Sequence, residues 1–203
     1  MQKGMLLLLG LGMLLSGCSG ESAAKDAGAP PEAAVYGMSA SQVEWDVCPL
    51  PEEEILAAYA QAVKVYSWFE TTPLPNSGEA VTVDGVLYHK VDKEGLSEMA
   101  SLRAYLRCVF SRELTDELLE SGGEVHYRDI DGVLYITGEG RERDASKGKT
   151  EIQVQQTGEA SYLVNVTVEL LDADGVAAGL ECWSFPYAFD EDRWVFSDFQ
   201  LVN

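Results

Sequence analysis

Cysteine and histidine are the residue types that most often supply nucleophiles, general bases and metal ligands, and the chain has four cysteines and two histidines. His89 and His126 stand far apart on segments with strand-like patterns, without the close spacing that metal ligands show. Residues 129–132 and 172–175 resemble fragments of a calcium loop, but each lacks an oxygen ligand two positions earlier, so we expect turns there. These patterns predict no catalytic residue, no metal ion and no cofactor.

Cys18 closes a motif that could be chemically modified. Before it, Lys3 is followed by an apolar run at residues 5–15, which is too short to cross a bilayer because a spanning helix needs about 20 residues. The sequence Leu-Ser-Gly at 15–17 resembles a bacterial lipobox, in which a peptidase cuts in front of an acylated cysteine. We therefore predict a signal peptide at residues 1–17, lipidation of Cys18 by chains such as palmitate, and export to the outer face of the cell membrane. An ordinary secretory signal that ends in cysteine is the alternative.

Three further cysteines remain after Cys18, namely Cys48, Cys108 and Cys182. An odd number of cysteines cannot all pair. Cys108 stands beside an apolar helical face and Cys182 precedes a tryptophan, so we expect buried thiols, with one disulfide as the alternative. A nucleophilic cysteine needs a basic partner that lowers its pKa, and the sequence places no histidine beside one. We therefore do not expect an enzyme.

The charge of the chain restricts its partners. It has 34 acidic and 14 basic residues, a formal net charge of −20. Such a chain would repel nucleic acid, so nucleic acid is excluded as a partner. The charge keeps an exported domain soluble, or it steers association with a basic partner surface.

Basic residues are concentrated at residues 138–149, where two arginines and two lysines supply four of the chain's 14. This segment joins two predicted strands with more residues than the two to five that a hairpin needs, and long loops in small domains are usually functional or disordered. We expect it to protrude, and the alternative is a merely solvated loop. The arginines could each offer a planar fork to a partner carboxylate. The candidate partner-binding residues are Arg141, Glu142, Arg143, Asp144 and Lys147.

The N-terminal half of the mature chain shows a tether followed by helices. Residues 18–44 are rich in Ala, Gly and Pro and predict a lipidated, flexible tether, with one folded domain at residues 45–203. Pro51 and the three glutamates after it predict a helix start, and Thr-Thr-Pro at 71–73 predicts its end. A second helical pattern follows at residues 96–109, and then a short helix that Ser111 or Thr115 would cap and that ends at a pair of glycines.

The C-terminal half alternates apolar and polar residues with a period of two, which predicts strands. Within it, the Asp-Gly pair at 131–132 favours a two-residue hairpin turn, and further turns are expected at 157–159 and 190–192. A similar Asp-Gly pair at 84–85 predicts an earlier hairpin between the first two helices. Helices followed by a run of hairpins are typical of an α+β domain. We predict N-terminal helices packed on a mostly antiparallel meander sheet.

Several of these segments together resemble a known family. The helix at 57–69, the stretches 102–111 and 127–135, and the closing segment 194–199 make the chain similar to the IseA-type DL-endopeptidase inhibitors of Gram-positive bacteria, from about residue 51 onward. The resemblance implies a non-enzymatic protein that binds cell-wall hydrolases, the NlpC-class cysteine peptidases, and blocks their active sites. That would restrain peptidoglycan turnover. The matching residues are packing and turn residues, so no inhibitory residue follows from them.

Two other functions fit the sequence. The first is a ligand-binding or sensory cell-surface lipoprotein domain, whose sign would be an enclosed apolar cavity lined by Tyr and Trp. The second is an enzyme, whose sign would be a cleft that brings a histidine within hydrogen-bond reach of Cys108 or Cys182. A simply secreted inhibitor would need neither a lipobox nor a tether, so the chain departs from the inhibitor family in these two features.

Overall fold

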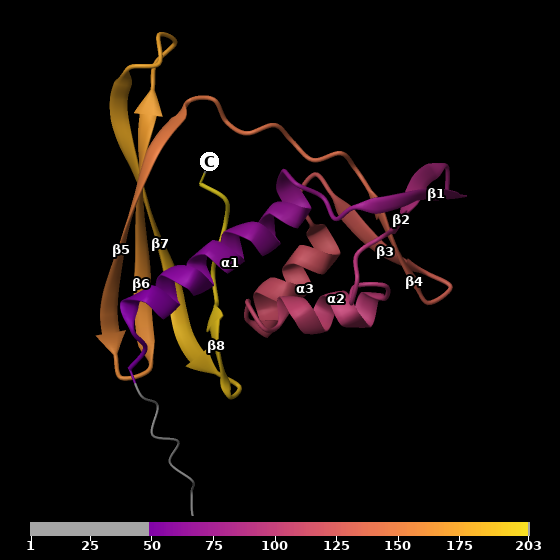
Figure 1. Ribbon diagram of the computed structural model, residues 1–203, viewed down its shortest axis with the longest axis horizontal. Helices are drawn as coiled ribbons and strands as arrows, with labels where there is room; N and C mark the ends of the chain where they lie inside the picture. The colour runs from indigo at the N-terminus through magenta and orange to yellow at the C-terminus, as the bar shows by residue number, and fades with distance from the viewer. Residues whose placement is uncertain (1–48, 203) are drawn as a thin grey trace, which may run out of the picture. The chain divides into compact units, whose positions relative to one another are not determined.

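The computed structural model describes residues 49–202, which form an α+β domain of three helices and eight strands (Figure 1). The predicted α+β class is thereby confirmed. The predictions for the signal peptide at 1–17, Cys18, the tether at 18–44 and Cys48 concern residues outside the described part. None of the helices within residues 49–202 is long and apolar enough to span a membrane.

Local signals mark the start of the first helix and both ends of the third. Helix α1 (Glu52–Glu70) starts directly after Pro51 with three glutamates in its first turn, where the helix dipole favours negative charge. Helix α2 (Met99–Leu106) is short, and α3 (Arg112–Ser121) follows it closely. The Ser111 hydroxyl accepts a hydrogen bond from the Leu114 N–H at 3.3 Å and so caps α3, which ends at Gly122. All three predicted helices are therefore present.

The strands form two antiparallel sheets and not the single meander that the sequence favoured. The first sheet has the order β1-β2-β4-β3, and the second has the order β5-β6-β7-β8. The first consists of β1 (Asn76–Val83), β2 (Val86–Val91), β3 (His126–Ile130) and β4 (Val133–Thr137). The second consists of β5 (Lys147–Gly158), β6 (Ser161–Leu171), β7 (Ala177–Asp190) and β8 (Arg193–Phe196). The sheet changes between β4 and β5, where the connecting residues pair with α1 and not with a strand.

The hairpin turns follow the predicted turn chemistry. Asp84 and Gly85 both have positive φ, as do Asp131 and Gly132, which is the requirement of the two-residue turn that suits twisted strands. The β5–β6 turn lies slightly later than expected, at residues 159–160. Strand β8 ends at Phe196, and residues 197–202 after it form a tail without regular secondary structure.

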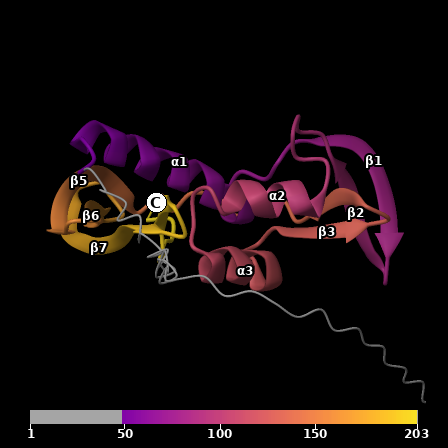
Figure 2. The same ribbon diagram turned by 90° about the horizontal axis from the view of Figure 1, so that it is seen from below.

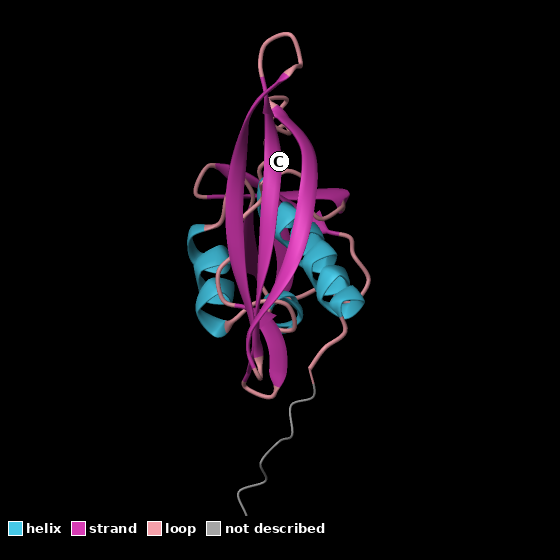
Figure 3. Ribbon diagram, turned by 90° about the vertical axis from the view of Figure 1, so that its left-hand side faces the viewer, coloured by secondary structure: helices cyan, strands magenta, loops and turns pink. Residues whose placement is uncertain are grey.

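Helix α1 contacts both sheets and forms the centre of the core. Near its start, the Tyr59 ring packs on Phe185 of β7 with centroids 6.0 Å apart, and at its end the Phe69 ring meets Tyr127 of β3 edge-on at 5.1 Å. Figures 1 and 2 show the helix running from the second sheet toward the first. Figure 3 views the molecule from the side of the second sheet, so that this sheet lies in front of the helices. Helix α1 therefore bridges the two sheets.

Candidate protein-binding loop

The predicted partner-binding segment is the connection that crosses from the first sheet to the second (Figure 1). Its start does not protrude, contrary to our expectation. Gly140 has a φ of +78°, and an added Cβ there would lie 3.0 Å from the Glu70 carbonyl oxygen, so the chain lies directly on the end of α1. This contact was not foreseen because it joins residues that are far apart in sequence.

Arg141 fixes the first end of the loop to α1. Its backbone N–H donates to the Glu70 carbonyl at 2.6 Å, and its side-chain Nε donates to the Glu70 carboxylate at 2.7 Å. The two side chains are only 37 % and 23 % exposed, which shields their ion pair partly from solvent. Arg141 is therefore used within the molecule, where the sequence had suggested a contact with a partner.

Asp144 and Lys147 fix the second end. The Asp144 carboxylate accepts hydrogen bonds from the Ser146 backbone N–H at 2.9 Å and the Ser146 hydroxyl at 2.7 Å, and Lys147 forms an ion pair with Glu181 of β7. The bond from the Ser146 hydroxyl is the largest of the effects that lower the pKa of Asp144. The Lys147 side chain is 16 % exposed, so this ion pair is the more enclosed of the two.

Between these two points lie five exposed residues, which we call the loop crest, residues 142–146. Glu142 and Arg143 stand on the crest with Asp144. Among the described residues, no ion pair holds the Arg143 side chain. The crest is thus a short charged segment whose two ends are fixed by ion pairs to α1 and β7, and such segments are suited to contact another protein.

The five predicted site residues are therefore divided between two places. Arg141, Asp144 and Lys147 meet around one open hollow, while Glu142 and Arg143 face solvent. The rest of the hollow is lined by Glu181 and Trp183 of β7 and by the tail residues 201–202. No sequence pattern pointed to Glu70, Glu181 or Trp183, because these residues of α1 and β7 reach the loop only in the folded chain.

The cysteines are not where the sequence placed them. Cys108 and Cys182 are both free and exposed, so the prediction of buried thiols is wrong. Cys108 lies just beyond α2 and its thiol donates to the Ala104 carbonyl at 3.3 Å, while the strand alternation of β7 turns Trp183 inward and Cys182 outward. No hydrogen bond joins either thiol to an imidazole, and no metal-binding group of side chains occurs, within residues 49–202. The non-enzymatic function stays a prediction.

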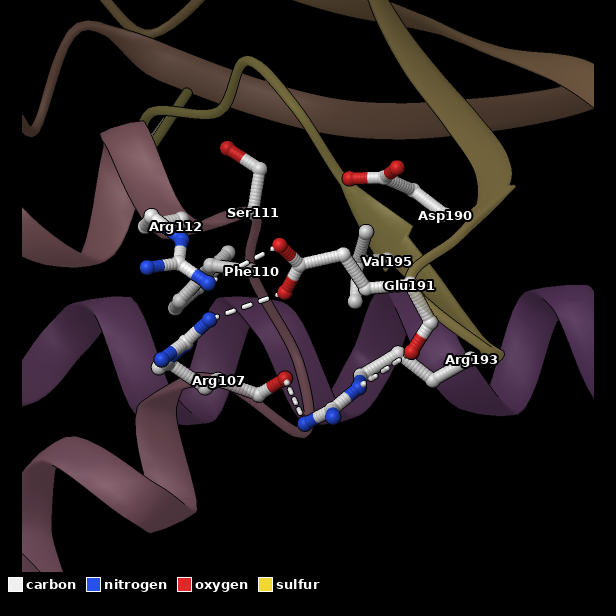
Figure 4. Close-up of a pocket in the computed structure, with 8 residues that line it drawn as sticks. All are labelled: Arg107, Phe110, Ser111, Arg112, Asp190, Glu191, Arg193 and Val195. Atoms are coloured by element: carbon white, nitrogen blue, oxygen red, sulfur yellow. Dashed lines mark hydrogen bonds and ion pairs between the residues drawn. The ribbon is translucent and has the colours of Figure 1, made fainter. Parts of the chain in front are cut away.

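A second polar cluster lies at the β7–β8 turn (Figure 4). The Glu191 carboxylate accepts hydrogen bonds at 2.9 Å from both Arg107 and Arg112, and Arg193 donates to the Arg107 carbonyl. Bonding to Arg112 is the main reason that the pKa of Glu191 is lowered. These residues line a small hollow together with Asp190, so three arginines and two carboxylates lie there together. The cluster fastens the turn to the helices, and its Arg193 donates to the backbone carbonyls of Glu191 and Arg107.

An aromatic hollow bears on the alternative of a ligand-binding domain. Tyr187, Trp194 and Phe196 line it together with Cys108 and Gln61. It is open to solvent, whereas the ligand-binding alternative calls for an enclosed cavity.

No family model matches the chain, and no curated protein matches it. The similarity to IseA-type inhibitors therefore stays a prediction that rests on the residues quoted for it.

Proposed function

We propose that this chain is a membrane-anchored extracytoplasmic inhibitor of peptidoglycan DL-endopeptidases. In this proposal it binds an NlpC-class cysteine peptidase as a protein partner and blocks the entrance to its active site. The sequence resemblance supplies the class of partner. The observation that carries the proposal is the loop crest, residues 142–146, an exposed charged segment held at both ends.

A loop held at both ends is suited to inhibition for a thermodynamic reason. Ordering a free loop on binding opposes association, and a loop that is already fixed in the free protein avoids most of this cost. Inhibitors of peptidases typically change little in backbone conformation when they bind. The Glu70–Arg141 and Lys147–Glu181 ion pairs supply this fixation here.

The charges of the crest also fit a protein partner. Arg143 can form two parallel hydrogen bonds with a carboxylate, and Glu142 and Asp144 offer acceptors on either side of it in the sequence. Arginine is enriched among the residues that dominate binding energy in protein interfaces. A mixed-charge segment of this kind gives the contact its specificity through charge complementarity.

An inhibition assay tests the proposal. The chain from residue 18, carrying Cys18→Ala so that it is not lipidated, is added to several purified DL-endopeptidases acting on peptidoglycan. We expect saturable inhibition of at least one enzyme, and no effect on a muramidase, which cuts the glycan and not the peptide. An absence of inhibition across all the endopeptidases would remove the proposal.

A further inference from the structure

One open hollow is lined mainly by apolar and aromatic side chains. Ala58 of α1 and the rings of Tyr187, Trp194 and Phe196 line it, and the exposed Cys108 also belongs to its lining. No charged side chain of residues 49–202 lines it. Removing apolar surface from water is favourable, so an apolar side chain that filled this hollow would stabilise the protein.

The described chain begins close to this hollow. The Leu50 N–H donates to the Tyr162 hydroxyl at 2.9 Å, and the centroid of the Tyr162 ring lies 5.5 Å from that of Trp194, which lines the hollow. Leu50 itself packs against the core. Figures 1 and 2 show the start of α1 beside the second sheet, which carries Trp194. The chain before Leu50 therefore starts from a fixed point that Tyr162 links to the hollow.

The sequence before this point offers an apolar segment that can reach the hollow. Trp45 and Val47 alternate with Asp46, and this period gives one apolar side to an extended segment. Trp45 stands five positions before Leu50, and an extended chain advances about 3.4 Å per residue, so its reach is about 17 Å. An indole ring is among the side chains that bury most apolar area. Because the segment belongs to the same chain, its effective concentration at the hollow exceeds that of a separate protein.

We propose that residues 45–48 dock on this hollow. The Trp45 ring packs against Trp194 and covers the Cys108 thiol. Asp46 stays on the solvent side of the docked segment, since no basic residue lines the hollow to pair with it. The folded domain then begins at residue 45, where the predicted tether ends. This inference concerns the chain alone and does not depend on the partner of the loop crest.

The reactivity of the Cys108 thiol measures whether the hollow is covered. The chain from residue 18 carries Cys18→Ala and Cys48→Ser, so that Cys108 and Cys182 are its remaining thiols. Their alkylation by N-ethylmaleimide is followed by mass spectrometry of proteolytic peptides. We expect Trp45→Ala to speed alkylation of Cys108 about tenfold, the factor that ~1.4 kcal/mol of docking free energy gives, and to leave the rate at Cys182 unchanged. Cys182 is the internal control because it is exposed on β7 and lies outside the hollow.

Two further variants make the test specific. Trp45→Phe retains an aromatic ring and should keep most of the protection of Cys108, whereas Tyr36→Ala removes an aromatic residue of the predicted tether and should change neither rate. An equal Cys108 rate in the parent and in Trp45→Ala would overturn the proposal. Equal acceleration at both thiols would overturn it too, because the protection would then not be local. Protection of Cys108 that increases with protein concentration would place a second copy on the hollow, which contradicts docking within one chain.

Discussion

Arg141 is bonded to Glu70 twice, through its backbone N–H to the Glu70 carbonyl and through its Nε to the Glu70 carboxylate. The two residues are 71 positions apart, and their contact ties the connection between the sheets to the end of α1. It is the reason that the crest starts from a fixed point. A mutation at this contact should reduce the order of the crest while it changes the stability of the domain little. The two effects can therefore be measured separately.

Replacing Glu70 with Gln should weaken inhibition with little effect on stability. The pair is partly exposed, so its loss costs about 1 kcal/mol or less, which corresponds to about a fivefold higher inhibition constant if that energy is spent on ordering the crest. The inhibition constant and the urea midpoint are measured together. The matched control is Arg103→Gln, which breaks the exposed ion pair with Asp116 on the helices. Equal inhibition by the two variants would refute the role given to Glu70.

Arg143 is expected to contribute most to binding among the basic residues of the segment. Arg143→Ala should raise the inhibition constant about 30-fold, the factor that corresponds to the ~2 kcal/mol of a residue that dominates an interface. Lys149→Ala is the control, because Lys149 is also basic and exposed but lies on β5, outside the crest. If both variants bind as the parent does, Arg143 makes no contact with the partner.

In the connection between β4 and β5, Gly138 is the residue that should tolerate an added side chain least. An added Cβ would lie 2.2 Å from the Glu124 carbonyl oxygen, and the φ of +95° is unfavourable for any other residue. Gly138→Ala should therefore destabilise the domain by about 2 kcal/mol more than Gly132→Ala, which shares a positive φ of +79° but has open space around it. Urea unfolding of both variants measures the difference. Equal destabilisation would mean that the backbone at Gly138 moves away at no cost.

Cys18 is expected to hold the protein on the membrane. Cys18→Ala should move the protein from the membrane fraction to the soluble fraction without changing its unfolding midpoint, because several residues of predicted tether separate Cys18 from the domain. Fractionation of cells that express either form, followed by detection of the protein, makes the comparison. A variant that still sediments with membranes would rule out the lipid anchor at this residue.

Local patterns in the sequence predicted much of the fold. Three kinds of signal act only on residues that are close in sequence, and each is present in the structure. They are the acids at the start of α1, the Ser111 cap of α3, and the Asp-Gly turns at 84–85 and 131–132. The division into two sheets could not be predicted in the same way. It depends on β4 pairing with β2 and on the next segment lying on α1, which are contacts between distant parts of the chain.

Contacts between distant parts of the chain also could not be predicted for the single residues of the candidate site. An excess of basic residues pointed to the segment, but the sequence did not reveal that Arg141 and Lys147 are paired with Glu70 and Glu181, which are 71 and 34 positions away. Cys182 was misplaced for another reason. Its strand alternates inward and outward, and an apolar neighbour such as Trp183 indicates the opposite face and not a shared one.

The central claim is that the crest blocks the hydrolase, and the most direct measurement is inhibition by a chain in which residues 142–146 are replaced with Gly-Ser-Gly-Ser-Gly. A matched control replaces the exposed tip of the β6–β7 hairpin, residues 172–176, with the same linker. For an endopeptidase that the parent chain inhibits, we predict that the crest variant loses inhibition while its urea midpoint stays close to that of the parent, and that the control still inhibits. A crest variant that folds and inhibits as well as the parent would contradict the account.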